Sequence, residues 1–412
     1  MAEAVRLMYT RIIAAMVILR HNLMETVQLP MIETEKVTRA RAVKRRGPTA
    51  ARNESALLIS PLDSKHIVGV EEVTLPDGTP AVSARVSFDG GVSWRESWPL
   101  PAGSSWSGVV GPVLAIDAHG TLNLAVLALE TDRTRASLVV YLSQDGGIHW
   151  SYPSVVMRGE AACSYSIATD MNPNSPFRGN VYLATDMDNT LCFARSSDGE
   201  CWNGKGDARP GMLLPGLSFN PEVLVDARGS VHVVWMTGPA GYAIRAASSA
   251  DGGNEFHAPV TVAEGITIAQ EGLPETVPAT CITGDGAAVC VWSDDREGRS
   301  RIYFRHSLDT GRTWQGPPAG APLVSDSEPN QHEFQPHLIV TPGGEILCAF
   351  YEYGPKPPDG ELLIDLAMAI SYDRGATFGH RMVLSEQPWD PADDKPLSRA
   401  ATRGALGWLA LG

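Results

Sequence analysis

Residues 87–94 read SFDGGVSW, and this pattern returns five more times along the chain. Each copy follows Ser-x-Asp-x-Gly-x-x-(Trp/Phe), except that one copy is a residue shorter. The other copies are SQDGGIHW (143–150), SSDGECW (196–202), SADGGNEF (249–256), SLDTGRTW (307–314) and SYDRGATF (371–378). Their Asp residues stand at 89, 145, 198, 251, 309 and 373, a period of 53 to 64 residues. A repeat of this length predicts an architecture of repeated supersecondary units.

Each copy is suited to a turn between two strands, and we call the six copies the repeat turns. The Ser hydroxyl and Asp carboxylate can accept hydrogen bonds from loop N–H groups, and Gly supplies a positive φ. The terminal aromatic residue anchors the next strand. The repeated Asp residues are therefore predicted to be structural and not catalytic.

The segments around each repeat turn predict the fold. Two apolar strands joined by a short turn come first, as in PEVLVDARGSVHVVWM (221–236), and a third strand runs into the repeat turn, as in RIYFRHS (301–307). A fourth strand follows it. The expected fold class is all-β, a six-bladed β-propeller with four-stranded antiparallel blades. The expected blades are 55–100, 112–157, 165–214, 221–263, 277–324 and 335–385.

Composition limits the partners. The chain has 412 residues with 40 Gly and 30 Pro, which fits many turns. Its 47 Asp and Glu against 33 Lys and Arg argue against nucleic-acid binding, which needs clustered cations. No run of 18 apolar residues occurs, so no membrane span is expected. The expected partner is a small-molecule or glycan ligand.

The charge divides the chain into two regions. Residues 1–50 form a basic segment with nine Lys and Arg against four Asp and Glu, and we expect it to be partly helical or flexible. Residues 51–412 are expected to form the propeller. A signal peptide is one interpretation of the apolar run 8–19, but no small-x-small cleavage site follows it. The sequence leaves the location open, with the cytoplasm favoured over secretion.

The cysteines predict no metal site, because none of the six lies in a C-x-x-C pair. No cofactor is expected either. Cys281 and Cys290 flank Asp285-Gly286, and a two-residue hairpin there would place them directly opposite each other. They are expected to be facing buried thiols, with a disulfide as the alternative.

Chemistry is expected on the face opposite the repeat turns, where the loops between second and third strands lie. SDDREGRSR (293–301) places Asp294, Asp295 and Arg296 directly after a strand. Paired carboxylates beside a guanidinium suit acid–base catalysis with an anion anchor. The alternative is a solvated loop in which Arg296 pairs with its neighbours.

Blade six contributes a second polar group to this face. NQHEFQPH (330–337) carries His332, Glu333 and His337, and Glu352 with Tyr353 ends the next strand. The His spacing is poor for a metal, so a polar pocket wall is expected. The expected catalytic residues are Asp294, Asp295, Glu333 and Glu352, and Arg296, His337 and Tyr353 are expected to bind substrate.

Trp235 and Trp292 occupy equivalent positions near the ends of second strands, as does Phe350. They would form an aromatic wall that binds substrate, for example a sugar ring. The alternative is that they pack between blades.

The repeat turns resemble the Asp-box, or bacterial neuraminidase, repeats of the sialidase superfamily, over about residues 55–385. The same boxes occur in sialidases, other glycosidases, lectins and assembly or sorting receptors, so the resemblance implies the fold more strongly than an activity. A sialidase would have a Tyr nucleophile paired with a Glu, an Asp acid/base and three Arg residues that bind the substrate carboxylate. Arg52 stands near the place of the first Arg, although the family's Ile-Pro does not follow it.

The resemblance also bears on the nucleophile. FQPHLIVTPGGEILCAFYEYG (334–354) is similar to the stretch that carries the sialidase Tyr, but the Tyr would fall close to Gln335. Because Gln cannot act as that nucleophile, ordinary retaining chemistry is not expected. Inverting hydrolysis by two carboxylates and a water is the remaining route, with Asp294 or Asp295 facing Glu333 or Glu352.

Three kinds of function remain open. The first is a sialidase-like glycoside hydrolase with non-standard catalytic residues. The second is a carbohydrate-binding or interaction propeller without chemistry. The third is a lyase or cyclase acting on a small, largely apolar molecule in the same funnel. A compact carboxylate pair would indicate the first, shallow exposed aromatics the second and a deep apolar pocket the third.

Overall fold

A computed structural model describes residues 52–98, 106–131, 135–159, 164–206, 208–238, 241–268, 277–325, 327–328, 331–354, 363–385 and 388. The basic segment 1–50 lies outside these residues. In the described part, strands are joined by turns, and the helical structure is one 3₁₀ turn, Met187–Asn189. No described helix has the length and hydropathy needed to span a bilayer.

The strands form five hydrogen-bonded sheets, four with four strands and one with seven. The first sheet contains β1 (Arg52–Ile59), β2 (Ile67–Thr74), β3 (Pro80–Ser87) and β4 (Arg95–Ser97). The second contains β5 (Trp106–Ile116), β6 (Leu122–Glu130), β7 (Ala136–Ser143) and β8 (Ser154–Gly159). The seven-stranded sheet contains β9 (Tyr165–Thr169), β10 (Val181–Thr185), β11 (Thr190–Ser196), β12 (Gly211–Val225), β13 (Val231–Thr237), β14 (Tyr242–Ser249) and β15 (Val260–Ile266). The last two contain β16 (Ala279–Ile282), β17 (Ala288–Asp294), β18 (Arg301–Ser307) and β19 (Ala321–Pro322), and then β20 (His332–Val340), β21 (Ile346–Tyr353), β22 (Ile364–Ser371) and β23 (Met382–Val383).

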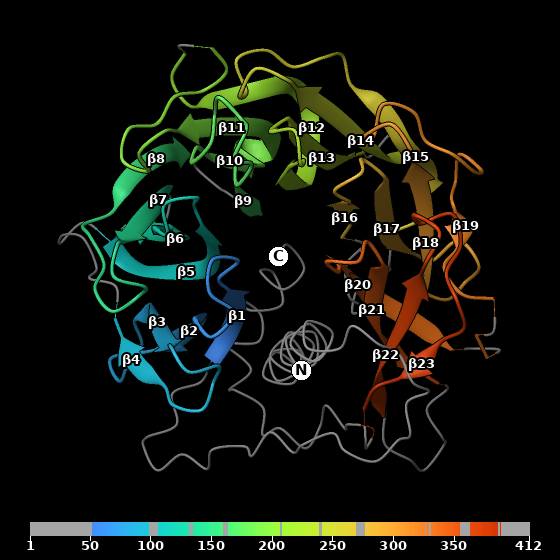
Figure 1. Ribbon diagram of the computed structural model, residues 1–412, viewed down its shortest axis with the longest axis horizontal. Coiled ribbons are helices and arrows are strands. Elements are labelled where there is room, and N and C mark those ends of the chain that lie inside the picture. The colour runs from blue at the N-terminus through green and yellow to red at the C-terminus, as the bar shows by residue number, and fades with distance from the viewer. Residues whose placement is uncertain are drawn as a thin grey trace.

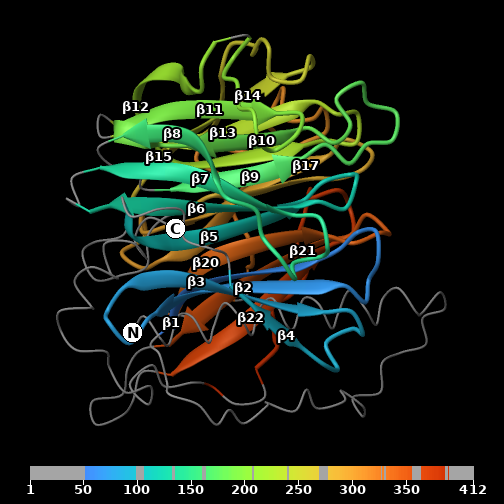
Figure 2. The same ribbon diagram turned by 90° about the vertical axis from the view of Figure 1, so that its left-hand side faces the viewer.

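The sheets follow one another around a central axis in chain order (Figure 1). Strands β1, β5, β9, β16 and β20 lie nearest the axis, and β4, β8, β15, β19 and β23 lie at the outer edge. Every neighbouring strand pair is antiparallel, so connecting loops gather on two opposite faces, as Figure 2 shows from the side. The expected all-β propeller is confirmed.

Strand β12 joins two four-stranded groups into the seven-stranded sheet. Its first part pairs with β11, up to Thr190↔Leu217, and its second part pairs with β13, from Ser218↔Thr237 onward. The chain therefore passes without a loop from the outer edge of one group to the inner strand of the next.

The repeat turns share one hydrogen-bonding pattern. In all six, the Ser hydroxyl donates to Asp Oδ1 at 2.7–2.9 Å and accepts from the N–H of a following Gly at 2.8–2.9 Å. In five, the same carboxylate accepts the N–H four residues later, as Asp309 does from Thr313 at 2.8 Å. The shorter copy makes that bond one residue earlier, from Cys201 to Asp198 at 2.7 Å. The repeated Asp residues act inside the turns, as their sequence predicts.

These hydrogen bonds lower the pKa of the repeat-turn carboxyls. The pKa of Asp89 falls from 3.8 to about 2, chiefly through the Ser93 hydroxyl and N–H. At Asp145 burial acts in the opposite direction, but hydrogen bonds from His149 and Ser143 outweigh it and the pKa is also about 2. A carboxyl with a depressed folded-state pKa contributes stability that is present above its unfolded-state pKa and is lost as the pH falls through its folded-state pKa.

We therefore expect the free energy of unfolding to fall as the pH is lowered from about 4 to about 2. The double variant Asp89→Asn/Asp145→Asn should be less stable near neutral pH and should lose less stability over that window. Urea unfolding at several pH values measures both effects, with Asp63→Asn, outside the repeat turns, as the control. An unchanged slope in the double variant would contradict the assignment.

The expected opposition of Cys281 and Cys290 is wrong. Cys281 pairs with Val289, and Cys290 pairs with Thr280. The turn at Thr283–Ala287 is wider than a two-residue hairpin, which shifts the register by one and turns the two side chains to opposite faces of the sheet. Both are free thiols, and burial raises the pKa of Cys281 to about 12.

Candidate functional site

The loop that follows β17 meets the chain entering β20 on the face opposite the repeat turns. We call the polar residues gathered there the loop cluster. It comprises Asp294, Asp295, Arg296, Ser300, Gln331, His332, Glu333, Glu352, Tyr353 and Arg381. The two sequence stretches expected to converge, 293–301 and 330–337, are therefore in contact.

Asp294 is buried under the loop and binds its backbone and the Arg296 side chain. Its carboxylate, fully buried, accepts the N–H of Thr267 at 3.3 Å and of Arg296 at 2.9 Å, and it forms an ion pair with the Arg296 guanidinium. That guanidinium also lies 4.0 Å from the centre of the Tyr303 ring. Arg296 thus pairs with its neighbour Asp294, as the alternative interpretation of this stretch expected, but Asp294 is buried where that interpretation expected a solvated loop.

Ser300 connects the two stretches. Its N–H donates to Nδ1 of His332 at 3.2 Å, and its carbonyl accepts the N–H of Glu333 at 2.8 Å. An imidazole nitrogen that accepts this bond carries no proton, so neutral His332 has its proton on Nε2. Burial lowers the pKa of His332, against the opposing charge of Asp295.

Glu333 and Glu352 form a cross-strand pair on β20 and β21. Glu333 is fully buried and accepts hydrogen bonds from the Ile302 N–H at 3.1 Å and from the Ser327 hydroxyl. Glu352, 2% exposed, accepts from Arg381 at 3.3 Å. Burial, opposed by Arg381 and reinforced by the charge of Glu333, raises the pKa of Glu352 to about 7. A compact carboxylate pair is therefore present, but both side chains are buried.

The partly exposed residues of the cluster are Asp295, Arg296, His332, Tyr353 and Arg381. The rings of His332 and Tyr353 are stacked, with centroids 4.6 Å apart and planes 4° apart. Burial raises the pKa of Asp295, and the nearby Asp294 adds to the effect. Of the four carboxylates expected to be catalytic, Asp295 is partly exposed and the other three are buried.

Two further residues predicted to bind substrate, His337 and Arg52, are not members of the loop cluster. His337 is half-buried on β20, beyond a bulge that follows Phe334, and burial lowers its pKa to about 4. Arg52 begins β1, where its backbone pairs with Val73. The side chain of Arg52 lies outside the described residues.

Trp235 and Trp292 lie in hydrophobic cores between strand groups. Trp235 is 3% exposed and packs in the core that contains Phe193, and Trp292 is fully buried beside Cys290 and Tyr303. Neither ring can contact a ligand in this arrangement. The structure supports the packing interpretation and contradicts the expected aromatic wall.

A repeated bulge was missed from the sequence. Gly111, Asn220 and Gln335 each precede a proline on an inner strand, and their φ values are 62°, 52° and 48°. Each stands at a register shift in β5, β12 or β20. The signal was a (Gly/Asn/Gln)-Pro pair at the same place in three repeats. Strained backbone of this kind is enriched at functional sites, and the Gln335 Oε1 atom is buried with no hydrogen-bond donor among the described residues.

Gln331 and Arg381 were also missed. Gln331 lies within NQHEFQPH (330–337) but was not singled out there, and Arg381 stands in no recognisable motif. Arg381 donates to Gln331 at 2.7 Å and also to Glu352. These hydrogen bonds connect the residue before β23 to the residue before β20 and to β21. Within the described ranges, no three His, Cys, Asp or Glu side chains are grouped so as to hold a metal ion.

Comparisons with known proteins give neighbours in fold. No family model matches the chain, and no curated protein matches it. Among solved structures, it is similar to a leech intramolecular trans-sialidase complexed with 2,7-anhydro-Neu5Ac (12% identity, 73% of this chain, 65% of that chain, TM-score 0.47). It is also similar to NanB sialidase from Streptococcus pneumoniae (11% identity, 73% of this chain, 65% of that chain, TM-score 0.49). A third similar structure is an α-L-arabinofuranosidase from Fusarium graminearum (16% identity, 77% of this chain, 92% of that chain, TM-score 0.47).

The chain spans 65% of the length of the two sialidases. At these identities and TM-scores, the roles of residues in this protein rest on its own geometry.

Proposed function

We propose that the protein is a six-bladed propeller of the sialidase type whose repeat turns are Asp boxes. The count of six treats the seven-stranded sheet as two blades that share β12. Two observations support it: that sheet contains two repeat turns, and β12 changes partner from β11 to β13 midway along its length.

We further propose that the loop cluster binds a glycan or another small polar ligand and that the protein is a glycoside hydrolase with non-standard catalytic residues. The observation that carries this proposal is the placement of Asp295, with its raised pKa, beside the stacked rings of His332 and Tyr353. A carboxylic acid with a raised pKa can donate a proton to a leaving group, and a flat ring can support a sugar face.

The other three carboxylates of the cluster would have different roles. Asp294 and Glu333 are buried and already accept several hydrogen bonds, so they position the loop and the strand entry. Glu352 would contribute through its pKa of about 7, as the group that exchanges a proton with the cluster near neutral pH.

A panel of aryl glycosides, including arabinofuranosides, tests hydrolysis, and a glycan array tests binding. Turnover or saturable glycan binding that is lost in a Tyr353→Ala variant, with the fold intact by circular dichroism, supports the proposal. Binding that survives in Tyr353→Ala and Asp295→Asn would place the site elsewhere.

We expect no release of sialic acid from a simple chromogenic sialoside above background. Gln335 stands near the place of the nucleophile and cannot attack the anomeric carbon, and loss of such a group costs orders of magnitude in rate. Discontinuous product assays with purified protein measure this, with a Gln335→Tyr variant for comparison. Rapid sialoside hydrolysis by the unmodified protein would mean that the nucleophile has been misplaced.

A non-catalytic carbohydrate-binding or interaction propeller is the second candidate. It is favoured by the burial of Asp294, Glu333 and Glu352, which leaves one of the four predicted catalytic carboxylates partly exposed, where inverting hydrolysis uses two. Glycan binding without turnover of any glycoside in the panel would select this candidate.

A further inference from the structure

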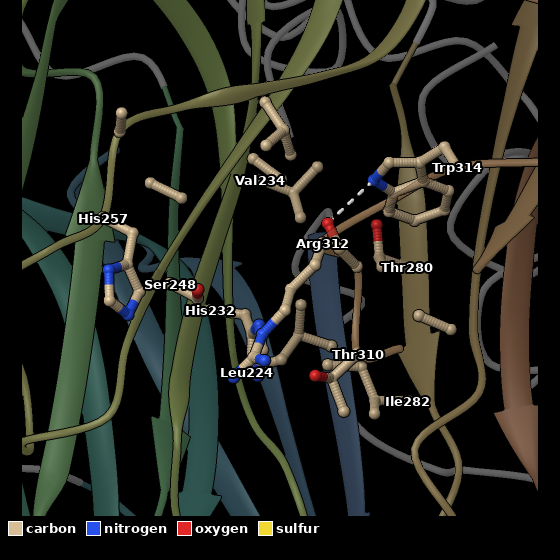
Figure 3. Close-up of a pocket in the computed structure, with 16 residues that line it drawn as sticks. Leu224, His232, Val234, Ser248, His257, Thr280, Ile282, Thr310, Arg312 and Trp314 are labelled. Carbon is tan, nitrogen blue, oxygen red and sulfur yellow. Dashed lines mark hydrogen bonds between the residues drawn. The ribbon is translucent and has the colours of Figure 1, made fainter. Parts of the chain in front are cut away.

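A pocket of about 390 Å³ lies between strands β12–β14 and the facing strands β16 and β17 (Figure 3). Residues of the fifth repeat turn, Thr310 to Arg312, form part of its wall. It therefore opens on the repeat-turn side of the propeller, at the opposite ends of the strands from the loop cluster. Its size is within the usual range of small-molecule sites.

The pocket exists because β14 carries small side chains. In each strand that leads into a repeat turn, the residues three and one before the Ser occupy equivalent places. In the first five repeats one or both of them lie in a core shared with the next strand group, as Phe193 does with Trp235 and Phe304 with Phe350. These pairs are Ala84 and Val86, Val140 and Leu142, Phe193 and Arg195, Ala246 and Ser248, Phe304 and His306, and Met368 and Ile370. The pair on β14, Ala246 and Ser248, has the smallest side chains of the six. The space that larger side chains would fill at these positions is part of the pocket.

One part of the pocket wall is apolar. Leu224 on β12 and Val234 on β13 face Ile282 on β16, and the Trp314 ring borders the same space. The indole N–H of Trp314 donates to the Gly311 carbonyl at 3.1 Å, which fixes the ring. A ligand with a flat or branched apolar body would fit against these side chains.

The other part is polar and carries positive charge. Nε2 of His232 lies 3.1 Å from Asp226 Oδ2, and both side chains are buried, so the imidazole orientation is fixed. Arg312 extends toward His232 and Ser248 in Figure 3. Among the described residues, no carboxylate lies within ion-pair distance of Arg312.

We propose that this pocket is a second ligand site, separate from the loop cluster, which binds a small carboxylic acid with an apolar body. The carboxylate would pair with Arg312 and accept from the Ser248 hydroxyl, and the apolar body would occupy the space that Ala246 leaves open. The site does not depend on the function proposed for the loop cluster.

Titration calorimetry with 2-naphthoate as the probe tests the proposal, with neutral 2-naphthamide as the matched compound. We expect saturable binding of the acid, weakened about tenfold or more in Arg312→Gln because a charge-assisted hydrogen bond is lost. Arg374→Gln, which removes an exposed arginine from the sixth repeat turn, should leave the affinity unchanged.

Ala246→Phe should abolish binding, because it fills the pocket as Phe193 and Phe304 fill the equivalent spaces, and the unfolding temperature should not fall. Ser248→Leu, which copies Leu142 at the equivalent position, should act in the same way if Ala246→Phe disturbs folding. The proposal is overturned if the acid does not bind the unmodified protein, if both folded filled variants bind it fully, or if the amide binds as tightly as the acid.

Discussion

Replacing Asp295 by Asn is expected to lower glycoside turnover by about 10²–10⁴-fold, the usual contribution of a general acid or base. The amide keeps the size of the side chain and removes the ionisable group whose pKa burial raises. The loop itself should persist, because its hydrogen bonds are made by the Asp295 N–H, which donates to the Thr267 carbonyl at 3.0 Å, and by Asp294.

The measurement is kcat and kcat/KM against pH on whichever glycoside the panel selects. Asp77→Asn is the matched control, since Asp77 lies in the loop between β2 and β3 on the same face. The alkaline limb of the pH profile, where the general acid loses its proton, should change in Asp295→Asn alone. Equal rates in Asp295→Asn and the unmodified protein would remove Asp295 from the chemistry and favour the binding propeller.

Trp292→Ala is expected to destabilise the protein by about 3–5 kcal/mol, the usual cost of removing a buried Trp or Phe side chain. The ring is fully buried, and it packs so closely on Gly320 that a Cβ there would lie 2.5 Å from it. The cavity would lie in the core between the seven-stranded sheet and strands β17 and β18, and would weaken the packing between them.

Urea unfolding measures this loss. Trp98→Ala is the control, because the Trp98 ring is half exposed and its removal should change the free energy of unfolding by about 0.5 kcal/mol or less. A stability of Trp292→Ala close to that of the unmodified protein, combined with lost ligand affinity, would instead restore the aromatic-wall interpretation.

The repeat turns and the propeller class could be predicted from the sequence, because the decisive interactions are local. In SFDGGVSW the Ser, Asp and Gly that bond to one another lie within a few residues, so their spacing is visible in the chain. The convergence of 293–301 with 330–337 followed from the same regularity, since equivalent loops of successive repeats lie on one face.

The tertiary structure alone decided which of these polar and aromatic side chains are accessible. Asp294 and Asp295 are neighbours in the chain, yet one is fully buried and the other partly exposed, because burial depends on what the adjacent strand group packs against them. For the same reason Trp292 belongs to a core, and a turn wider than expected set Cys281 and Cys290 on opposite faces. The pocket beside Ala246 was hidden for a related reason: a small residue in one strand becomes a cavity only when the facing strand does not move in to fill it.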